Sequence, residues 1–302
     1  MDADTTLTNL SFTKSAIYKS LKGFVPGYIK GPSNNPERMY NENTLVLITG
    51  GSGGLGYPIA LSLAKKKVNV IIVDLLRPRF MDDMDEHIHF YKCDISSLKD
   101  IKNLRDQIIN DFGYVSILIN NAGITSIALL RETENEQIEK VIKINLIGAY
   151  MMTQIFLPDI MKNQYGAIVN ISSILGIITP ARLCPYGSSK AGVILLHESL
   201  KDYLIRKKCS TPNLGNIKTL LVCPGKIKTS MFEKIITPSK IIAPDINPTQ
   251  LAEQITHALE QNGPDVILAP YYANIIPLFK KLEWPYVEIL KKLSRMNQVT
   301  NV

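Results

Sequence analysis

From residue 44 onward, short apolar runs rich in β-branched residues alternate with longer stretches of helical periodicity. The runs predict strands that are buried on both faces, and the stretches between them predict crossover helices. The expected strands are residues 45–49, 68–73, 88–92, 116–120, 167–172, 218–223 and a weaker 265–269, and the expected helices are residues 57–66, 98–112, 134–163, 186–206 and 248–260. Because right-handed crossovers cover both faces of a sheet, this alternation predicts an α/β fold, a Rossmann-like doubly wound parallel sheet of about seven strands. Its site is expected at the carboxyl ends of the strands.

The 302 residues divide into one expected domain and two terminal segments. Residues 44–270 form the expected domain, with an N-terminal extension at 1–43 and a C-terminal tail at 271–302. Hydrophobic residues make up 45% of the chain and charged residues 20%, which supplies a sizeable core and argues against a disordered protein. The net charge of +7 is diffuse, so it argues against a nucleic-acid partner and favours an anionic cofactor or a membrane surface.

The cysteines and histidines show no spacing typical of a metal site or a disulfide framework. No Cys-x-x-Cys pair occurs among Cys93, Cys184, Cys209 and Cys223, and no histidine is placed to complete a zinc site. We therefore expect reduced thiols and no metal. The first ten residues lack the basic start and apolar run of a signal peptide, and Gly, Pro or Asn interrupts each long uncharged run. These features predict a cytoplasmic protein without a membrane span.

A glycine-rich turn stands between the first expected strand and the first expected helix. It reads Thr49-Gly50-Gly51-Ser52-Gly53-Gly54-Leu55-Gly56. Glycine allows positive φ and a close approach of the backbone to a pyrophosphate, whose charge the free N–H groups of the helix start stabilise. A strand, a glycine turn and a helix in this order predict a dinucleotide site. The alternative is a flexible turn that binds nothing.

The second expected strand runs into Asp74, 24 residues after Gly50. A carboxylate at this point can accept hydrogen bonds from both hydroxyls of an adenosine ribose, and it repels a 2′-phosphate. This favours NAD over NADP. Arg77 and Arg79 close behind leave NADP open, because a guanidinium binds phosphate well.

The form of the turn, Thr-Gly-x-x-x-Gly-x-Gly, resembles that of the short-chain dehydrogenase/reductase family. Further along, Cys93-Asp94-Ile95, Asn120-Asn121-Ala122-Gly123 and Pro224-Gly225 with Thr229 resemble the family's adenine-side, central and nicotinamide-side segments. The resemblance covers residues 44 to about 270 and implies an NAD(P)-dependent oxidoreductase. The cofactor-binding residues that it implies, together with the glycine turn and Asp74, are Thr49, Gly50, Ser52, Gly54, Leu55, Gly56, Asp74, Asp94, Ile95, Asn121, Ala122, Gly123, Tyr186, Lys190, Pro224, Gly225 and Thr229.

Tyr186 and Lys190 lie four residues apart at the start of an expected helix, so one helix face presents both side chains. A phenol is a poor acid or base at neutral pH, but an adjacent ammonium and an oxidised nicotinamide favour the phenolate, which can then exchange the proton of an alcohol. Ser173 or its neighbour Ser172 would hydrogen-bond the same oxygen. The family spacing selects Ser173, 13 residues before the tyrosine, and the resemblance adds Asn145 as the anchor of a water that links Lys190 to solvent. The implied catalytic residues are Asn145, Ser173, Tyr186 and Lys190.

Residues 226–247 are rich in apolar side chains and lie where the family has its substrate lid. With the nearly uncharged residues 175–183 on the other wall, they predict a lipophilic small-molecule substrate, unless they only pack on the sheet. The tail and residues 14–25 are basic and amphipathic, so each can lie on an anionic bilayer or dock against its own or a partner subunit.

These terminal features make the chain similar to the branch with membrane-associated 17-beta-hydroxysteroid and retinol dehydrogenases. That similarity implies peripheral contact with the endoplasmic reticulum or lipid droplets, and the family implies a homodimer or homotetramer. The favoured hypothesis is an oxidoreductase that interconverts an alcohol and its carbonyl. The alternative is a non-catalytic nucleotide-binding or membrane-surface protein that keeps the fold for recruitment; the intact catalytic set argues against it.

Overall fold

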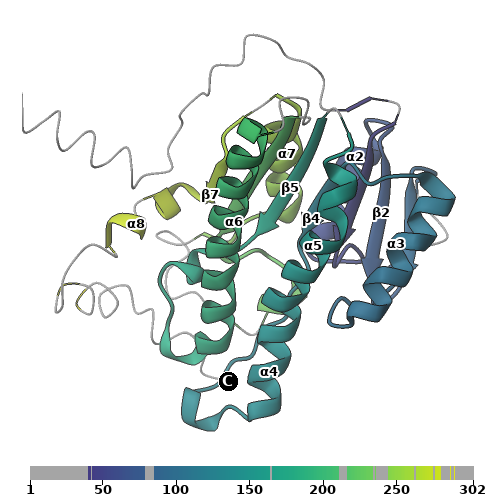
Figure 1. Cartoon of the computed structure of the whole chain (residues 1–302). Coiled ribbons are helices and arrows are strands. Elements are labelled where there is room, and N and C mark those ends of the chain that lie inside the picture. Colours follow the sequence, from purple (N-terminus) through teal and green to yellow (C-terminus); the bar gives the residue numbers. More distant parts are fainter. Residues whose placement is uncertain are drawn as a thin grey trace, which may run out of the picture.

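Figure 1 shows the computed structural model, a parallel sheet with helices on both faces. It describes residues 40–41, 43–78, 85–163, 165–210, 216–233, 235, 244–261, 263–274, 276–279, 286 and 289. The strands are β1 (Leu45–Thr49), β2 (Asn69–Asp74), β3 (Ile88–Lys92), β4 (Ile117–Asn120), β5 (Tyr165–Ile171), β6 (Asn216–Pro224) and β7 (Val266–Ala269). They lie in the order β3-β2-β1-β4-β5-β6-β7, and all neighbours are parallel. The predicted fold class is confirmed.

The helices form a layer on each face of the sheet (Figure 1). They are α2 (Gly56–Ala64), α3 (Leu98–Phe112), α4 (Asn135–Ile142), α5 (Gly148–Ile160), α6 (Cys184–Ser210), α7 (Pro248–Glu260) and the short α8 (Ile276–Phe279), with 3-10 turns at Leu130–Glu132, Ile174–Gly176, Ala181–Leu183, Ser230–Phe232 and Tyr271–Asn274. Alternate residues of β1 point to opposite layers: Val46 and Ile48 pack with α2 and α7, and Leu45 and Leu47 pack with α3, α5 and α6. Two separate cores therefore stabilise the sheet.

The strand order reverses between β1 and β4, because the chain crosses from β3 at one edge to the middle of the sheet. The loops that leave β1 and β4 diverge to opposite faces at such a switch point and leave a crevice at the carboxyl edge. This crevice is where the glycine turn and the segment that begins at Asn121 meet, as the sequence predicted.

The expected helix at 134–163 is divided into α4 and α5 by a π turn at Lys143–Ile147. A π turn adds one residue to the helical repeat and frequently marks a functional position. Here it carries Asn145, whose side chain is buried. The sequence pattern did not predict this interruption.

The run Asn135–Ile160, which spans α4, the π turn and α5, is long and apolar enough to cross a membrane by length and composition alone. Its residues Met152, Phe156 and Ile160 are fully buried against the sheet. This packing is that of a core helix in a globular domain.

A buried ion pair joins α3 to α5. Arg105 donates from Nε to Asp159 Oδ2 at 2.6 Å and from Nη2 to Oδ1 at 2.7 Å, and the Asp159 side chain is 1% exposed. A bidentate pair of this kind fixes the relative position of the two helices.

Asp159→Ala is expected to lower the free energy of unfolding by about 2 kcal/mol, because the Arg105 guanidinium, whose side chain is 28% exposed, loses two charge-assisted hydrogen bonds to a buried carboxylate. Urea unfolding measures this loss. Asp106→Ala is the matched control: Asp106 Oδ1 lies 3.8 Å from Arg105 Nη1 but its side chain is 73% exposed, so its removal should cost less than about 0.5 kcal/mol. Equal losses in the two variants would contradict the interpretation.

The terminal segments are described only in part. The first residues of the tail pack on the domain: Ala273 and Ile276 are buried against Ile174. This first portion of the tail therefore docks against its own chain, which is one of the alternatives that the sequence left open. The expected helix at 14–25 and most of the tail lie outside the described residues.

Candidate active site

Hydrogen bonds between the segment that follows β4 and the end of β1 tie the glycine turn to the middle of the sheet. Asn121 donates from Nδ2 to the carbonyls of Thr49 (2.9 Å) and Gly50 (3.0 Å), and Thr49 Oγ1 accepts from the backbone N–H groups of Asn121 and Ala122 at 3.1 Å each. Gly50 has a φ of +64°, and a Cβ there would lie 2.8 Å from the Cα of Ala122. Only glycine fits this conformation and this approach.

Two carboxylates, Asp74 and Asp94, line the crevice near the glycine turn. Asp74, at the end of β2, accepts from the backbone N–H of Ser52 at 3.2 Å and from that of Leu75 at 2.8 Å. Asp94 follows β3 and accepts from the backbone N–H of Ser96 at 2.8 Å. Both carboxylates are thus held by the backbone around the glycine turn and the neighbouring loop.

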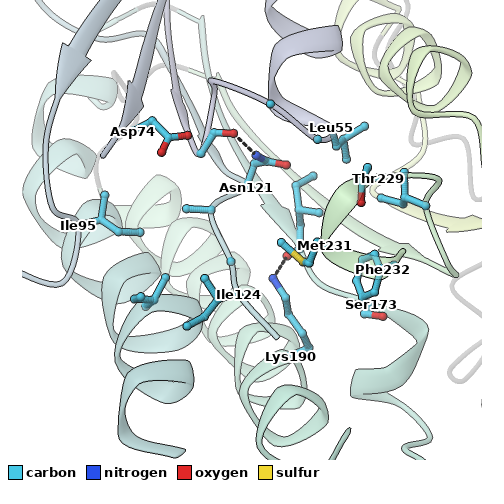
Figure 2. A pocket seen from close by; sticks show the side chains of 18 of the residues that line it. Leu55, Asp74, Ile95, Asn121, Ile124, Ser173, Lys190, Thr229, Met231 and Phe232 are labelled. Atoms are coloured by element: carbon cyan, nitrogen blue, oxygen red, sulfur yellow. Dashed lines mark hydrogen bonds between the residues drawn. The ribbon is translucent and has the colours of Figure 1, made fainter. Parts of the chain in front are cut away.

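A cavity of about 290 Å³ runs along this edge of the sheet. Figure 2 shows Asp74 and Ile95 at one end of it and Ser173, Lys190 and Phe232 at the other. Of the residues that the sequence predicted for the site, the cavity lining includes Gly50, Gly54, Leu55, Asp74, Asp94, Ile95, Asn121, Ala122, Gly123, Ser173, Tyr186, Lys190, Pro224, Gly225 and Thr229. Thr49, Ser52, Gly56 and Asn145 are not part of this lining. The structure therefore brings both groups of predicted residues, the cofactor side and the catalytic side, to one continuous space.

The residues at this cavity fit a dinucleotide. In the glycine turn, Gly50, Gly53 and Gly54 line the cavity without side chains, and the Ser52 hydroxyl is buried without a hydrogen-bond partner among the described residues. A buried hydroxyl beside a helix start is suited to a phosphate oxygen.

Tyr186 and Lys190 are both buried on the first turns of α6, each with 4% exposure. The Lys190 ammonium lies 5.9 Å from the centre of the Tyr186 ring and donates to the Ile171 carbonyl at 2.8 Å (Figure 2). Burial lowers the pKa of Lys190 to about 8. Burial also raises the pKa of Tyr186, an effect that a hydrogen bond with Ser173 opposes. Burial thus favours the neutral phenol in the chain by itself.

Ser172 and Ser173 make different contacts at the end of β5. Ser172 Oγ donates to the Lys190 carbonyl at 2.7 Å, which fastens α6 to the sheet. Ser173 Oγ donates to the Pro224 carbonyl at 3.2 Å and accepts from the backbone N–H of Leu175 at 3.1 Å, and Ser173, Tyr186 and Pro224 all line the cavity. Of the two hydroxyls, that of Ser173 is the one beside the phenol.

The side-chain amide of Asn145 joins two segments of the site, because both its oxygen and its nitrogen form hydrogen bonds. Oδ1 accepts from the backbone N–H of Ile124 at 2.8 Å, and Nδ2 donates to the Ile124 carbonyl at 2.9 Å and to Ser189 Oγ at 3.0 Å. Ser189 in turn donates to the Tyr186 carbonyl at 2.7 Å. The sequence interpretation missed Ser189, although a helical serine often bonds the carbonyl one turn back, which was the available signal.

An apolar cap covers the phenol. Phe232 packs edge-on against Tyr186, with ring centres 5.9 Å apart at 83°. Leu183 and Ile235 complete the buried cluster, and the partly buried Ile127 and Leu175 lie against it, so the cap combines three loops. Phe232 and Ile235 belong to the segment predicted as the lid.

A model of the short chain dehydrogenase family matches residues 44–240. An uncharacterized oxidoreductase of Saccharomyces cerevisiae is 45% identical over 288 residues, which cover 95% of this chain and 93% of the relative. Human estradiol 17-beta-dehydrogenase 11 is 27% identical over 280 residues, covering 90% of this chain and 89% of the relative. Among solved structures, ElxO with NADP bound is 29% identical with a TM-score of 0.64, covering 74% of this chain and 96% of the other.

Proposed function

The chain belongs to the short-chain dehydrogenase family, and on that premise we propose that it interconverts an alcohol and its carbonyl by hydride transfer. The family makes it an oxidoreductase with an NAD(P)-binding fold. One observation carries the specific proposal: a single cavity is lined by the glycine turn at one end and by Ser173, Tyr186 and Lys190 at the other. A bound nicotinamide would supply or accept the hydride.

Each catalytic side chain has a role that follows from its contacts. Tyr186 is the acid/base that exchanges the proton of the alcohol oxygen, and Ser173, which lines the same cavity and lowers the pKa of Tyr186, orients that oxygen. The Lys190 ammonium, held by the Ile171 carbonyl, stabilises the phenolate when it forms. Asn145 keeps the loop after β4 and the start of α6 in register through Ile124 and Ser189.

Asp74 supports a preference for NAD over NADP. Its carboxylate is fixed beside the turn by Ser52 and Leu75, and a 2′-phosphate at this position would meet a like charge. Arg77 stands over the Phe90 ring, 5.9 Å from its centre, and a stacked guanidinium is partly committed to that ring.

NADH is expected to bind at least about tenfold more tightly than NADPH, a difference of about 1.4 kcal/mol. Fluorescence titration of the purified chain with each nucleotide measures it. Asp74→Ser should remove most of the preference, because serine still caps the turn but carries no charge. Asp106→Ser removes an exposed carboxylate of α3 and should leave the preference intact. Tighter binding of NADPH to the wild-type chain would overturn the assignment.

The apolar cap favours a lipophilic substrate. Phe232, Ile235 and Leu183 surround the phenol, so the part of the substrate next to the reacting carbon must exchange water for an apolar surface. A screen of lipophilic and polar alcohols with the preferred nucleotide, read as Tyr186-dependent turnover, tests this proposal. Turnover confined to polar sugars would contradict it.

Self-association of the chain and its contact with membranes remain predictions. Ile147, Tyr150 and Leu195, on the π turn, α5 and α6, are about half exposed and are the apolar side chains available to the homo-oligomer that the family implies. The cytoplasmic location and the peripheral membrane contact depend on terminal segments that lie largely outside the described residues.

A further inference from the structure

After its last strand, the chain returns to the end of the cavity that Ser173, Tyr186 and Lys190 line, which we call the reacting end. Beyond β7, the 3-10 turn Tyr271–Asn274 leads to α8, and the backbone N–H of Ala273 donates to the Pro270 carbonyl at 2.8 Å. Ala273 is fully buried against Ile174, the residue that follows Ser173. The C-terminal turn therefore supports the segment that carries the catalytic serine.

Tyr272 in this turn abuts the loop at Pro224–Gly225. A Cβ added at Gly225 would lie 2.7 Å from the Tyr272 hydroxyl oxygen, and its next contact would be Pro270 Cδ at 3.1 Å. The backbone N–H of Gly225 donates to the Ala269 carbonyl at 2.7 Å, which brings the loop and the turn together. The tyrosine thus occupies the space that a side chain at Gly225 would need.

Both ends of the lid segment are fixed near the same tyrosine. The N–H of Ile246 donates to the Lys226 carbonyl at 2.8 Å, and the N–H of Lys228 donates to the Ile246 carbonyl at 2.9 Å. Beside these backbone bonds, Lys226 Nζ forms an ion pair with Asp245 Oδ1 at 3.4 Å. Burial, and then the negative charge of Asp245, raise the pKa of Tyr272 to about 12, so the hydroxyl stays protonated beside Gly225 at neutral pH.

We propose that Tyr272 is a positioning residue of the active site, which holds the Pro224–Gly225 loop against the reacting end of the cavity. Pro224 transmits this position, because its carbonyl accepts the hydrogen bond of the Ser173 hydroxyl at 3.2 Å. Gly225 lines the same cavity as Tyr186 and Lys190. The inference rests on the proposed function in treating this loop as a wall of the cofactor site.

A double-substitution cycle tests the contact. Gly225→Ala is expected to weaken NADH binding about tenfold and to lower the melting temperature, because its Cβ meets the Tyr272 oxygen. Tyr272→Phe removes that oxygen, so Gly225→Ala combined with Tyr272→Phe should bind NADH within about threefold of Tyr272→Phe alone. The matched control is Tyr271→Phe, which removes the same atom from a neighbour that is 91% exposed and should rescue nothing.

Steady-state kinetics separate positioning from a merely structural role. Tyr272→Phe alone should lower kcat several-fold with a smaller change in the KM for the alcohol, because a displaced loop misaligns the reacting atoms rather than weakening uniform binding. The melting temperature of Tyr272→Phe should stay close to that of the wild-type chain. An unchanged kcat in Tyr272→Phe would contradict the positioning role of Tyr272.

The possible failures differ in their readout. If wild-type protein binds NADH and turns over through Tyr186, but Gly225→Ala is equally impaired with Tyr272→Phe and with Tyr271→Phe, this inference alone is wrong. If wild-type protein binds neither NADH nor NADPH, the proposed function fails and the positioning role fails with it. Rescue specific to Tyr272→Phe, in both NADH affinity and melting temperature, supports the inference.

Discussion

Turnover by Tyr186→Phe is expected to fall by about 10² to 10⁴ relative to the wild-type chain, while NADH binding is unchanged. The substitution removes the proton-exchanging hydroxyl and keeps the ring that packs against Phe232 at 5.9 Å. The cavity lining and the fold should therefore survive. Single-turnover measurement of NADH oxidation or formation, with the nucleotide affinity determined in parallel, separates loss of chemistry from loss of binding.

Tyr203→Phe serves as the control for this substitution. Tyr203 lies on the same helix, α6, but its side chain is about half exposed on the outer surface. Its hydroxyl should be dispensable for turnover. Wild-type turnover in Tyr186→Phe would contradict the acid/base role of Tyr186. Binding of NADH without turnover of any alcohol or carbonyl by the wild-type chain would favour the non-catalytic nucleotide-binding alternative.

Lys190→Ala is expected to lower turnover by at least about 10², because no cation remains to stabilise the phenolate. The pKa of the Lys190 ammonium also predicts how the activity of the wild-type chain depends on pH.

This pKa is lowered to about 8, so the group is charged below that pH and neutral above it. If catalysis needs the charged form, kcat/KM should fall about tenfold per pH unit above about pH 8.

The pH profile also distinguishes Lys190 from other basic residues of α6. Lys201→Ala, which removes an exposed partner of Asp265, should keep the alkaline fall of kcat/KM. The residual activity of Lys190→Ala should show no such fall. An unchanged alkaline limb in Lys190→Ala would assign the titration to another group.

The sheet was predictable because its central strands are buried on both faces and its edge strands keep short apolar runs. β1 and β3 match the predicted bounds at both ends, and the other strands differ by at most two residues at either end. Amphipathic periodicity gave α3 and α7 with equal accuracy. The π turn at Lys143–Ile147 was not predictable in this way, since the apolar pattern continues through it and the hydrogen bonds of its Asn145 go to the backbone of Ile124, 21 residues away.

The candidate site likewise combines residues that local sequence spacing predicted with contacts that it did not predict. Gly50, Asp74 and the Tyr186–Lys190 pair carry their signal in local spacing, and the structure brings all of them to one cavity. The contacts of Phe232 with Tyr186 and of Tyr272 with Gly225 join residues that are far apart in the chain. No spacing rule reports such contacts, because they depend on how the loops fold back over the carboxyl edge of the sheet.

The reversal of strand order has an evolutionary consequence. The glycine turn, Asp74 and Asp94 precede β4, whereas Ser173, the apolar cap residues Leu183, Phe232 and Ile235, and the C-terminal turn all follow it. Substitutions that reshape the apolar cap can thus accumulate in the second part of the chain while the glycine turn, Asp74 and Asp94 stay unchanged. A lineage built on this chain can therefore change what it binds beside Tyr186 and still inherit the first part of the cavity.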